Sequence, residues 1–429
     1  MMAKGLKIAV IGGGSVYTPE LVEGFLARCA ELPVEELCLM DVDPERLRIV
    51  GGLAERMVRA AGGPFRVVLT TAQEEALLGA DFVIAQIRVG GVAARALDER
   101  IPLEFGVIGQ ETTGPGGFAK ALRTIPVMLK LAQAMEKLCP KAFLINFTNP
   151  SGVVTEALLR QSSIRVIGLC NVPLGLKHLI ASWLQVAPTE VELDYFGLNH
   201  LSWVRGVRWR GEDVFPRVFA QALEWARRGE FPFAPALLET LGLIPSYYLR
   251  YYYHHDEVLA EQKRAGRTRA EEVQAIDAEL LRMYADPALA RKPELLGKRG
   301  GAHYSTAAVA LISAIHNDRG EVHIVNVRNE GAIPDLPAQA VVEVPAVVDG
   351  EGAHPLPCGP LPPQVRGLVQ AVKAYEELTV EAAVGGDERR ALQALLAHPL
   401  VPSFAVAQGL WRALKEAHRS YLPQFFRAP

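Results

Sequence analysis

A short apolar run that ends in three consecutive glycines constrains the fold of this chain more than any other feature. Residues 6–11 predict a strand, the glycines predict a tight turn, and Pro19 opens a helical pattern. Glycines let the backbone approach a ligand closely, and a helix N-terminus favours negative charge. The segment therefore predicts a binding site for a dinucleotide pyrophosphate, contacted by Gly12, Gly13, Gly14, Ser15, Val16 and Tyr17.

An acidic residue follows the second predicted strand. Asp41 comes directly after an apolar run, where a carboxylate can accept hydrogen bonds from an adenosine ribose and so favour NAD over NADP. The spacing from Gly14 to Asp41 is longer than usual for such sites. A glycine turn can also be a plain connection between a strand and a helix, so both interpretations remain open on these residues alone.

Short apolar runs alternate with helical patterns as far as residue 170. This alternation predicts a parallel sheet covered on both faces, with strands at 6–11, 37–41, 66–70, 81–87, 142–146 and 165–169. Such sheets bind ligands at the carboxyl ends of their strands. Two further predicted strands are followed by polar or glycine-rich segments, residues 86–91 and 146–150. We therefore expect Arg88 and Asn146 to lie near the cofactor.

The rhythm changes beyond residue 190. Residues 201–209 and 322–327 predict antiparallel strands, 328–362 predicts loop and edge strand, and helices are expected at 216–228, 256–284, 303–317 and 363–395. With 429 residues, the chain is too long for one ordinary core. We expect an α/β fold like that of lactate and malate dehydrogenases. Residues 1–190 would form a Rossmann-like, doubly wound NAD-binding domain, and 191–429 a mixed α+β domain for substrate, metal and oligomerisation.

Composition excludes several classes of partner. The net charge of −3 provides no field for nucleic acid or an anionic membrane. There is no leader pattern, and no run approaches the roughly 18 apolar residues of a membrane span. The odd, scattered cysteines argue for a reducing compartment rather than a disulfide framework: Cys29, Cys38, Cys139, Cys170 and Cys358. We expect a cytoplasmic homodimer or homotetramer.

A cysteine and a histidine are candidate metal ligands. Cys170 follows the strand predicted at 165–169, and His200 lies 30 residues further on. A thiolate and an imidazole can bind a divalent metal and leave positions open for substrate oxygens. Alternatively, the cysteine is a small buried hydrophobe and the histidine a hydrogen-bonded core residue.

Three further features are candidates for chemistry. The tyrosine-rich segment 245–255 packs as a helix or interface, or supplies a base if one phenol lies near a metal or arginine. The glycine-dense loop 109–117 is a plain connection or an active-site loop in which Glu111 orients other groups. Several arginines form surface ion pairs or a fork for a phosphate: Arg88, Arg95, Arg123, Arg269 and Arg299.

These blocks, in this order, resemble glycoside hydrolase family 4, whose members depend on NAD and a metal. The matching segments are residues 11–25, 80–91, 101–127, 145–157, 168–173, 196–203, 248–253 and 298–305, with weaker similarity through 329–337 and 342–348. The sequence Cys-Asn-Val-Pro at 170–173 is similar to the 6-phospho-β-glucosidase branch. The α-acting branch tends to have Cys-Asp-Met-Pro and an additional Asp before the tyrosine, and residues 243–247 contain no carboxylate.

The resemblance implies hydrolysis of a phosphorylated disaccharide or glycoside to glucose 6-phosphate and an aglycone. The implied cycle comprises oxidation at sugar C3 with NAD, removal of the C2 proton, elimination of the aglycone, addition of water and reduction. Three alternatives remain: another family 4 specificity, an NAD-dependent 2-hydroxy-acid dehydrogenase, and a non-catalytic NAD(H) sensor.

The resemblance also implies roles for individual residues. Cys170 and His200 would bind Mn²⁺, and Tyr248 would be the base. Asn149 and Asn171 would hold sugar hydroxyls, within a substrate site that includes Glu111. Arg269 is the first choice for the 6-phosphate, and the weaker choices are Arg88, Arg95 and Arg299.

Overall fold

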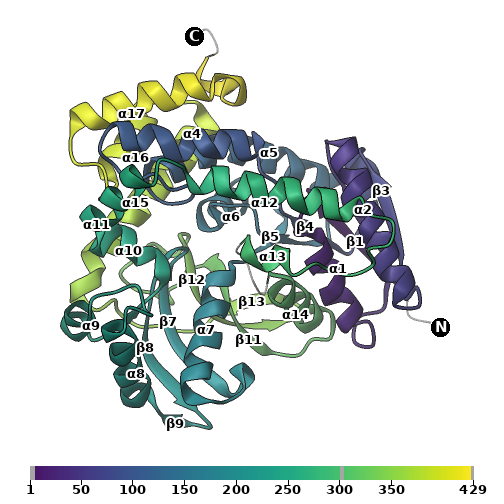
Figure 1. Cartoon of the computed structure of the whole chain (residues 1–429), viewed down its shortest axis with the longest axis horizontal. Coiled ribbons are helices and arrows are strands. Elements are labelled where there is room, and N and C mark those ends of the chain that lie inside the picture. Colours follow the sequence, from purple (N-terminus) through teal and green to yellow (C-terminus); the bar gives the residue numbers. More distant parts are fainter. Residues whose placement is uncertain (1–4, 300–303, 427–429) are drawn as a thin grey trace.

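A nine-stranded sheet forms the centre of the computed structural model, which describes residues 5–299 and 304–426 (Figure 1). Its strand order is β13-β12-β11-β6-β5-β4-β1-β2-β3. The strands are β1 (Leu6–Ile11), β2 (Val34–Met40), β3 (Arg66–Thr70), β4 (Phe82–Ala85), β5 (Phe143–Asn146), β6 (Arg165–Gly168), β11 (Glu321–Arg328), β12 (Val341–Asp349) and β13 (Gly352–Pro355).

The first six strands are parallel, in the order 3-2-1-4-5-6 of dinucleotide-binding sheets. Strands such as β1 and β4 are almost entirely apolar because helices bury both faces of a parallel sheet. The predicted Rossmann-like sheet is confirmed. Its helices are α1 (Thr18–Ala27), α2 (Pro44–Ala60), α3 (Gln73–Leu77), α4 (Gly91–Glu104), α5 (Gly114–Leu138), α6 (Ser151–Gln161) and α7 (Asn171–Leu184).

Strands from the second half of the chain extend this sheet. β11 pairs antiparallel with β6 and with β12, and β12 pairs antiparallel with β13. The expected edge strand is therefore wrong in part, because β12 is a long strand and the short β13 forms the edge beyond it. The sheet itself crosses residue 190, so the division into 1–190 and 191–429 stays a prediction.

A second, antiparallel sheet contains β7 (Val191–Leu198), β8 (Leu201–Trp209), β9 (Glu212–Asp213) and β10 (Ile244–Pro245). In Figure 1 it lies at the bottom of the view, far from α17 at the top. The remaining helices are α8 (Phe215–Arg227), α9 (Pro235–Leu241), α10 (Arg250–Tyr253), α11 (His255–Ala265), α12 (Arg269–Tyr284), α13 (Leu295–Lys298), α14 (Tyr304–His316), α15 (Pro363–Gly385), α16 (Glu388–Ala397) and α17 (Phe404–Ala417).

Two long helices expected from sequence are each divided into two. The segment 256–284 forms α11 and α12, and the segment 363–395 forms α15 and α16. Gly266 and Gly386 adopt left-handed φ angles of 64° and 68° at the ends of α11 and α15, a conformation that terminates helices. The helix expected at 303–317 is α14, and residue 303 lies outside the described residues.

Two structural findings concern the cysteines and the lengths of the helices. All five cysteines are free thiols. Within residues 5–299 and 304–426, no helix combines the length and the apolar composition needed to cross a bilayer.

A buried ionic cluster fixes the end of the chain to the helices of the parallel sheet. The carboxylate of Asp98 on α4 accepts two hydrogen bonds from Arg123 on α5, at 2.8 and 2.5 Å. His418, directly after α17, places its Nε2 atom 2.9 Å from the same carboxylate. All three side chains are shielded from solvent, so the charges of Asp98 and Arg123 depend on each other.

We expect Asp98→Asn to lower the free energy of unfolding by about 3–5 kcal/mol, because it leaves the buried Arg123 without its counter-charge. Urea denaturation followed by circular dichroism measures this change. Glu416→Gln, which removes an exposed ion pair with Arg419, serves as the control and should leave the midpoint unchanged. Equal midpoints for the wild type and Asp98→Asn would contradict the prediction.

Candidate active site

The glycine-rich turn passes directly over the ends of β1 and β2. Gly12 has a φ of 93°, and a Cβ atom there would lie 2.9 Å from the carbonyl oxygen of Gln86. The backbone N–H groups of Gly12 and Gly13 donate to the carbonyl oxygen of Met40, at 2.9 and 2.7 Å. Glycine at position 12 is thus required by both conformation and space.

Asp41 is fixed beside this turn. One carboxylate oxygen accepts the N–H of Gly14 at 2.8 Å, and the other accepts the N–H of Asp43 at 3.0 Å. Each oxygen has a further lone pair, so the carboxylate can still accept a hydrogen bond from a ribose hydroxyl. Ser15 closes the turn by donating its N–H to the carbonyl oxygen of Gly12 at 3.0 Å.

Residues distant in sequence hold the other side of the turn. Tyr284 on α12 donates its hydroxyl to the carbonyl oxygen of Val16 at 2.8 Å. The guanidinium of Arg299 lies 4.5 Å from the ring centre of Tyr17 and forms an ion pair with Asp277. Arg299 is therefore bound within the protein, between α12 and the cofactor turn.

The structure brings Cys170 and His200 together. Cys170 follows β6 and caps α7, where its Sγ atom accepts the N–H of Val172 at 3.5 Å. His200 lies in the turn between β7 and β8 with a left-handed φ of 64°. Its Nε2 atom is 3.3 Å from Sγ, and both side chains are buried. A pair this close can share one cation.

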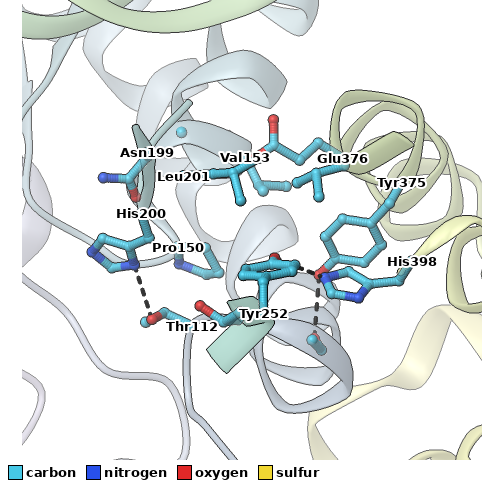
Figure 2. Close-up of a pocket in the computed structure, with 14 residues that line it drawn as sticks. Thr112, Pro150, Val153, Asn199, His200, Leu201, Tyr252, Tyr375, Glu376 and His398 are labelled. Carbon is cyan, nitrogen blue, oxygen red and sulfur yellow. Dashed lines mark hydrogen bonds between the residues drawn. The ribbon is translucent and has the colours of Figure 1, made fainter. Parts of the chain in front are cut away.

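Thr112 determines which nitrogen of His200 bears the proton. The Thr112 hydroxyl donates its hydrogen to Gln110 Oε1 at 2.9 Å. The Thr112 oxygen is therefore left to accept a hydrogen bond from the N–H at His200 Nδ1, at 3.0 Å (Figure 2). Nε2 then keeps its lone pair and faces Cys170. Burial lowers the pKa of His200 to about 3, so the ring is neutral, the form that binds metals.

With a metal bound, the pair would form an open rather than a closed site. In the part of the chain that the structure describes, no group of three or more His, Cys, Asp or Glu side chains could hold a metal ion. Two ligands leave coordination positions for substrate oxygens or water, as in catalytic sites. Sequence reasoning selected Cys170 and His200, whose role as metal ligands stays a prediction, but missed Thr112 and Gln110, whose only signal was the glycine-dense loop around them.

Tyr248 is the tyrosine that contacts this pair. Its ring stacks on the ring of His200, with centroids 3.7 Å apart and planes at 2°. Burial raises the pKa of the Tyr248 phenol well above its usual value, and the charge of Arg95 acts in the opposite direction. Its neighbour Tyr247 is half-exposed and contacts Tyr248 edge-on at 6.1 Å.

Glu111 lies at the centre of a cationic cluster. Its carboxylate pairs with Arg88, with Arg95 at 2.9 Å and with Lys120 at 2.7 Å. Burial alone would raise the pKa of Glu111, but the three cations hold it well below its usual range. Glu111 therefore orients these three cations. The sequence analysis did not predict that Lys120 belongs to this cluster.

Three asparagines surround the pair in different ways. Asn146 is fully buried, accepts the N–H of Thr148 and donates to Thr155 Oγ1, both at 3.0 Å. Asn146 thereby holds the loop after β5 in place, and its contact with the cofactor stays a prediction. Asn149 has a buried Oδ1 atom without a hydrogen-bond partner among the described residues. Asn171 begins α7, and its backbone N–H donates to the Cys170 thiol.

Arg269 and Arg95 lie in contrasting environments. Arg269 is half-exposed, forms an ion pair with Glu272 at 2.7 Å and donates to the carbonyl oxygen of Arg299 at 3.3 Å. Arg95 is buried between Glu99 and Glu111. Their roles in phosphate binding stay predictions.

A small cavity of about 20 Å³, lined by both polar and apolar side chains, adjoins His200 (Figure 2). Thr112 and Asn199 line the same side as His200, and Tyr252, Tyr375 and His398 line the opposite side. Burial lowers the pKa of His398 to about 3, so that ring is also neutral. The volume suits a single water molecule and excludes a sugar.

Two sequence profiles match the chain in succession. The profile of family 4 glycosyl hydrolases matches residues 7–186, and the profile of that family's C-terminal domain matches residues 195–401. The chain belongs to glycosyl hydrolase family 4. The resemblance found in the sequence is confirmed, and this family 4 member is a glycosidase.

Relatives cover nearly the whole of this family 4 chain. A probable 6-phospho-beta-glucosidase of Bacillus subtilis is 50% identical over 99% of both chains. A maltose-6'-phosphate glucosidase of the same organism is 32% identical over 100% of this chain and 99% of its own. The 6-phospho-beta glucosidase of Thermotoga maritima, solved with manganese, NAD+ and glucose-6-phosphate, has a TM-score of 0.91 at 39% identity, covering 97% of this chain and 99% of that one.

More distant similarity concerns the fold alone. Malate dehydrogenase of Plasmodium falciparum is 16% identical and has a TM-score of 0.54, covering 88% of this chain and 98% of that one. The expected likeness to lactate and malate dehydrogenases is thereby confirmed at the level of fold.

We expect the metal-free protein to react with Ellman's reagent at pH 8 in one fast phase, from the exposed Cys29. Burial raises the pKa of the Cys170 thiol to about 12, so little of it is the reactive thiolate. Absorbance and mass spectrometry of the labelled peptides identify the fast thiol. Cys29→Ser should lose the fast phase and Cys170→Ser should keep it; the opposite pattern would show that Cys170 is activated.

Proposed function

We propose that this protein hydrolyses 6-phospho-β-glucosides, phosphorylated disaccharides or glycosides, to glucose 6-phosphate and an aglycone, with NAD and Mn²⁺ as cofactors. The observation that supports this most directly is the stacking of Tyr248 on His200, whose Nε2 atom lies 3.3 Å from Cys170. A base thus adjoins an open metal site. The name of the relative at 50% identity agrees with this activity.

The residues present fit both cofactors. The turn at Gly12 and the adjacent Asp41 carboxylate suit a dinucleotide, and His200 presents a lone pair beside the Cys170 thiol. The Oδ1 atom of Asn149, which has no hydrogen-bond partner in the part of the chain that the structure describes, can accept a hydrogen bond from a sugar hydroxyl. When bound, the cofactors supply reversible hydride transfer and stabilise negative charge on sugar oxygens.

Each residue then has one task. Tyr248 removes the proton from sugar C2, and the neighbouring Arg95 favours its phenolate form. Asn149 and Asn171 hold sugar hydroxyls, and Glu111 orients Arg88 and Arg95. Thr112 keeps the proton of His200 on Nδ1, so that Nε2 can act as a ligand.

Substrate selection follows from the arginines and from the segment after Cys170. Arg269 is our first choice for the 6-phosphate because it is the most exposed of the candidates: its ion pair with Glu272 lies at the surface, whereas the ion pairs of Arg95 and Arg299 are buried. The sequence Cys-Asn-Val-Pro and the lack of a carboxylate at 243–247 favour β-linked substrates. Both proposals extend the family assignment.

We further propose a cytoplasmic location and assembly as a homodimer or homotetramer. The five free cysteines, one of them a metal ligand in this proposal, suit a reducing compartment. Light scattering of the purified protein measures the oligomeric state.

We expect 4-nitrophenyl β-glucoside 6-phosphate to be cleaved only when NAD⁺, Mn²⁺ and a thiol are all present. The unphosphorylated glycoside should react far more slowly, because it lacks the charge-assisted hydrogen bonds between the 6-phosphate and an arginine. Release of nitrophenol, with each component omitted in turn, measures both effects.

Other outcomes of this experiment would indicate other functions. Equal rates on both glycosides, or a preference for α-linked substrates, would contradict the branch assignment. Net NADH formation from a small hydroxy acid would indicate a dehydrogenase. Nucleotide binding without any phenol release would indicate a sensor.

Tyr248→Phe should retain NAD⁺ and Mn²⁺ binding but reduce turnover by roughly 10²–10⁴-fold, because only the base is removed. Tyr247→Phe is the matched control, because it removes a hydroxyl from the neighbouring tyrosine. That hydroxyl accepts a hydrogen bond from Arg250, whereas the ring that stacks on His200 is that of Tyr248. Steady-state rates and calorimetric binding measure the two effects. A fully active Tyr248→Phe would exclude Tyr248 as the base.

A further inference from the structure

A fully buried carboxylate lies between the two sheets. Glu343 on β12 accepts hydrogen bonds from the Tyr195 hydroxyl at 2.6 Å, from Asn199 Nδ2 at 2.9 Å and from Asn326 Nδ2 at 3.1 Å. All three donors are neutral. Among the residues at 5–299 and 304–426, none forms a cationic partner of this carboxylate.

Comparable carboxylates of this protein have cationic partners. Glu156, equally buried, lies 2.7 Å from Lys373 and from Arg160, and Asp98 is paired with Arg123. An uncompensated buried charge is costly, whereas a paired one is tolerated. Burial raises the pKa of the Glu343 carboxyl, and its three donors oppose that shift. Glu343 therefore lacks a positive charge that its surroundings should supply.

The missing charge can be located through Asn199. This side chain donates to Glu343 and also hydrogen-bonds the thiol of Cys170, and it directly precedes His200. The carboxylate is thus one side chain away from the cation site.

We propose that Glu343 is the outer-sphere carboxylate of this site. Its negative charge is compensated by the divalent cation bound at Cys170 and His200, and through Asn199 it positions the cysteine. The inference rests on the proposed function, because it requires that cation. Glu343 is a positioning residue: it touches neither the sugar nor the nucleotide. Partners of this kind commonly change metal affinity 10–100-fold.

Mn²⁺ titration of the full-length, metal-stripped protein tests the proposal, with free Mn²⁺ measured by its electron paramagnetic resonance signal. Glu343→Gln keeps the shape and removes the charge, so Mn²⁺ should bind 10–100-fold more weakly while NAD⁺ affinity is unchanged. Glu343→Asp keeps the charge and should bind Mn²⁺ more tightly than Glu343→Gln. Glu156→Gln, which alters an equally buried carboxylate away from the pair, should keep wild-type Mn²⁺ affinity.

Thermal unfolding separates this role from a purely structural one. Without metal, Glu343→Gln should unfold at the same temperature as the wild type or higher, because it removes an uncompensated charge. Saturating Mn²⁺ should then raise the unfolding temperature of the wild type more than that of the variant. A metal-free Glu343→Gln that unfolds well below the wild type would assign Glu343 a structural role and overturn the inference.

The remaining outcomes are decisive in different ways. If the wild type binds Mn²⁺ and Glu343→Gln binds it with an affinity within twofold of the wild type, this inference alone is overturned. Equal weakening in Glu343→Gln and Glu156→Gln, or weaker binding by Glu343→Asp than by Glu343→Gln, would also overturn it. If neither the wild type nor Cys170→Ser binds Mn²⁺, the proposed function is overturned, and the inference with it.

Discussion

The contact between the β7–β8 turn and the carboxyl end of β6 is the interaction on which the site depends. It brings His200 within 3.3 Å of Cys170, although the two residues belong to different sheets. The turn places a histidine in the left-handed region, a conformation of higher energy for a residue with a Cβ atom. Packing against β6 and the loop at Thr112 must hold it there, so the second sheet serves as a support for one imidazole.

The surroundings of this contact are polar but largely neutral where a ligand would bind. His200 and His398 are both uncharged, and Tyr248 is a neutral phenol until positive charge approaches it. The fixed charges lie one shell further out, in the Glu111 cluster on one side and at Glu343 on the other. Such an arrangement leaves the ligand positions free for groups that arrive with charge of their own.

Local sequence patterns were enough to predict what lies within one element or at its end. The six parallel strands, the turn at Gly12 and the position of Cys170 follow from apolar runs and the residues that end them. The stacking of Tyr248 on His200 could not be read from periodicity, because it joins a short 3₁₀ turn to a strand connection 48 residues away; the family resemblance alone singled out this tyrosine. Glu343 gave no signal, since one acidic residue in an apolar strand predicts an exposed edge rather than the buried middle of a sheet. Helix lengths were overestimated where single glycines ended them.

Residues of α12 and the end of α13 hold the glycine-rich turn in place, and they connect it to Arg269. Tyr284 and Arg299 hold Val16 and Tyr17 from outside, and the backbone of Arg299 in turn receives the side chain of Arg269. Under the proposed function, the segment that anchors the nucleotide turn is thus continuous with the segment that carries Arg269, our first choice for the 6-phosphate. Re-engineering nucleotide preference at this turn would then act on sugar recognition as well, and the two pockets would not be interchangeable modules.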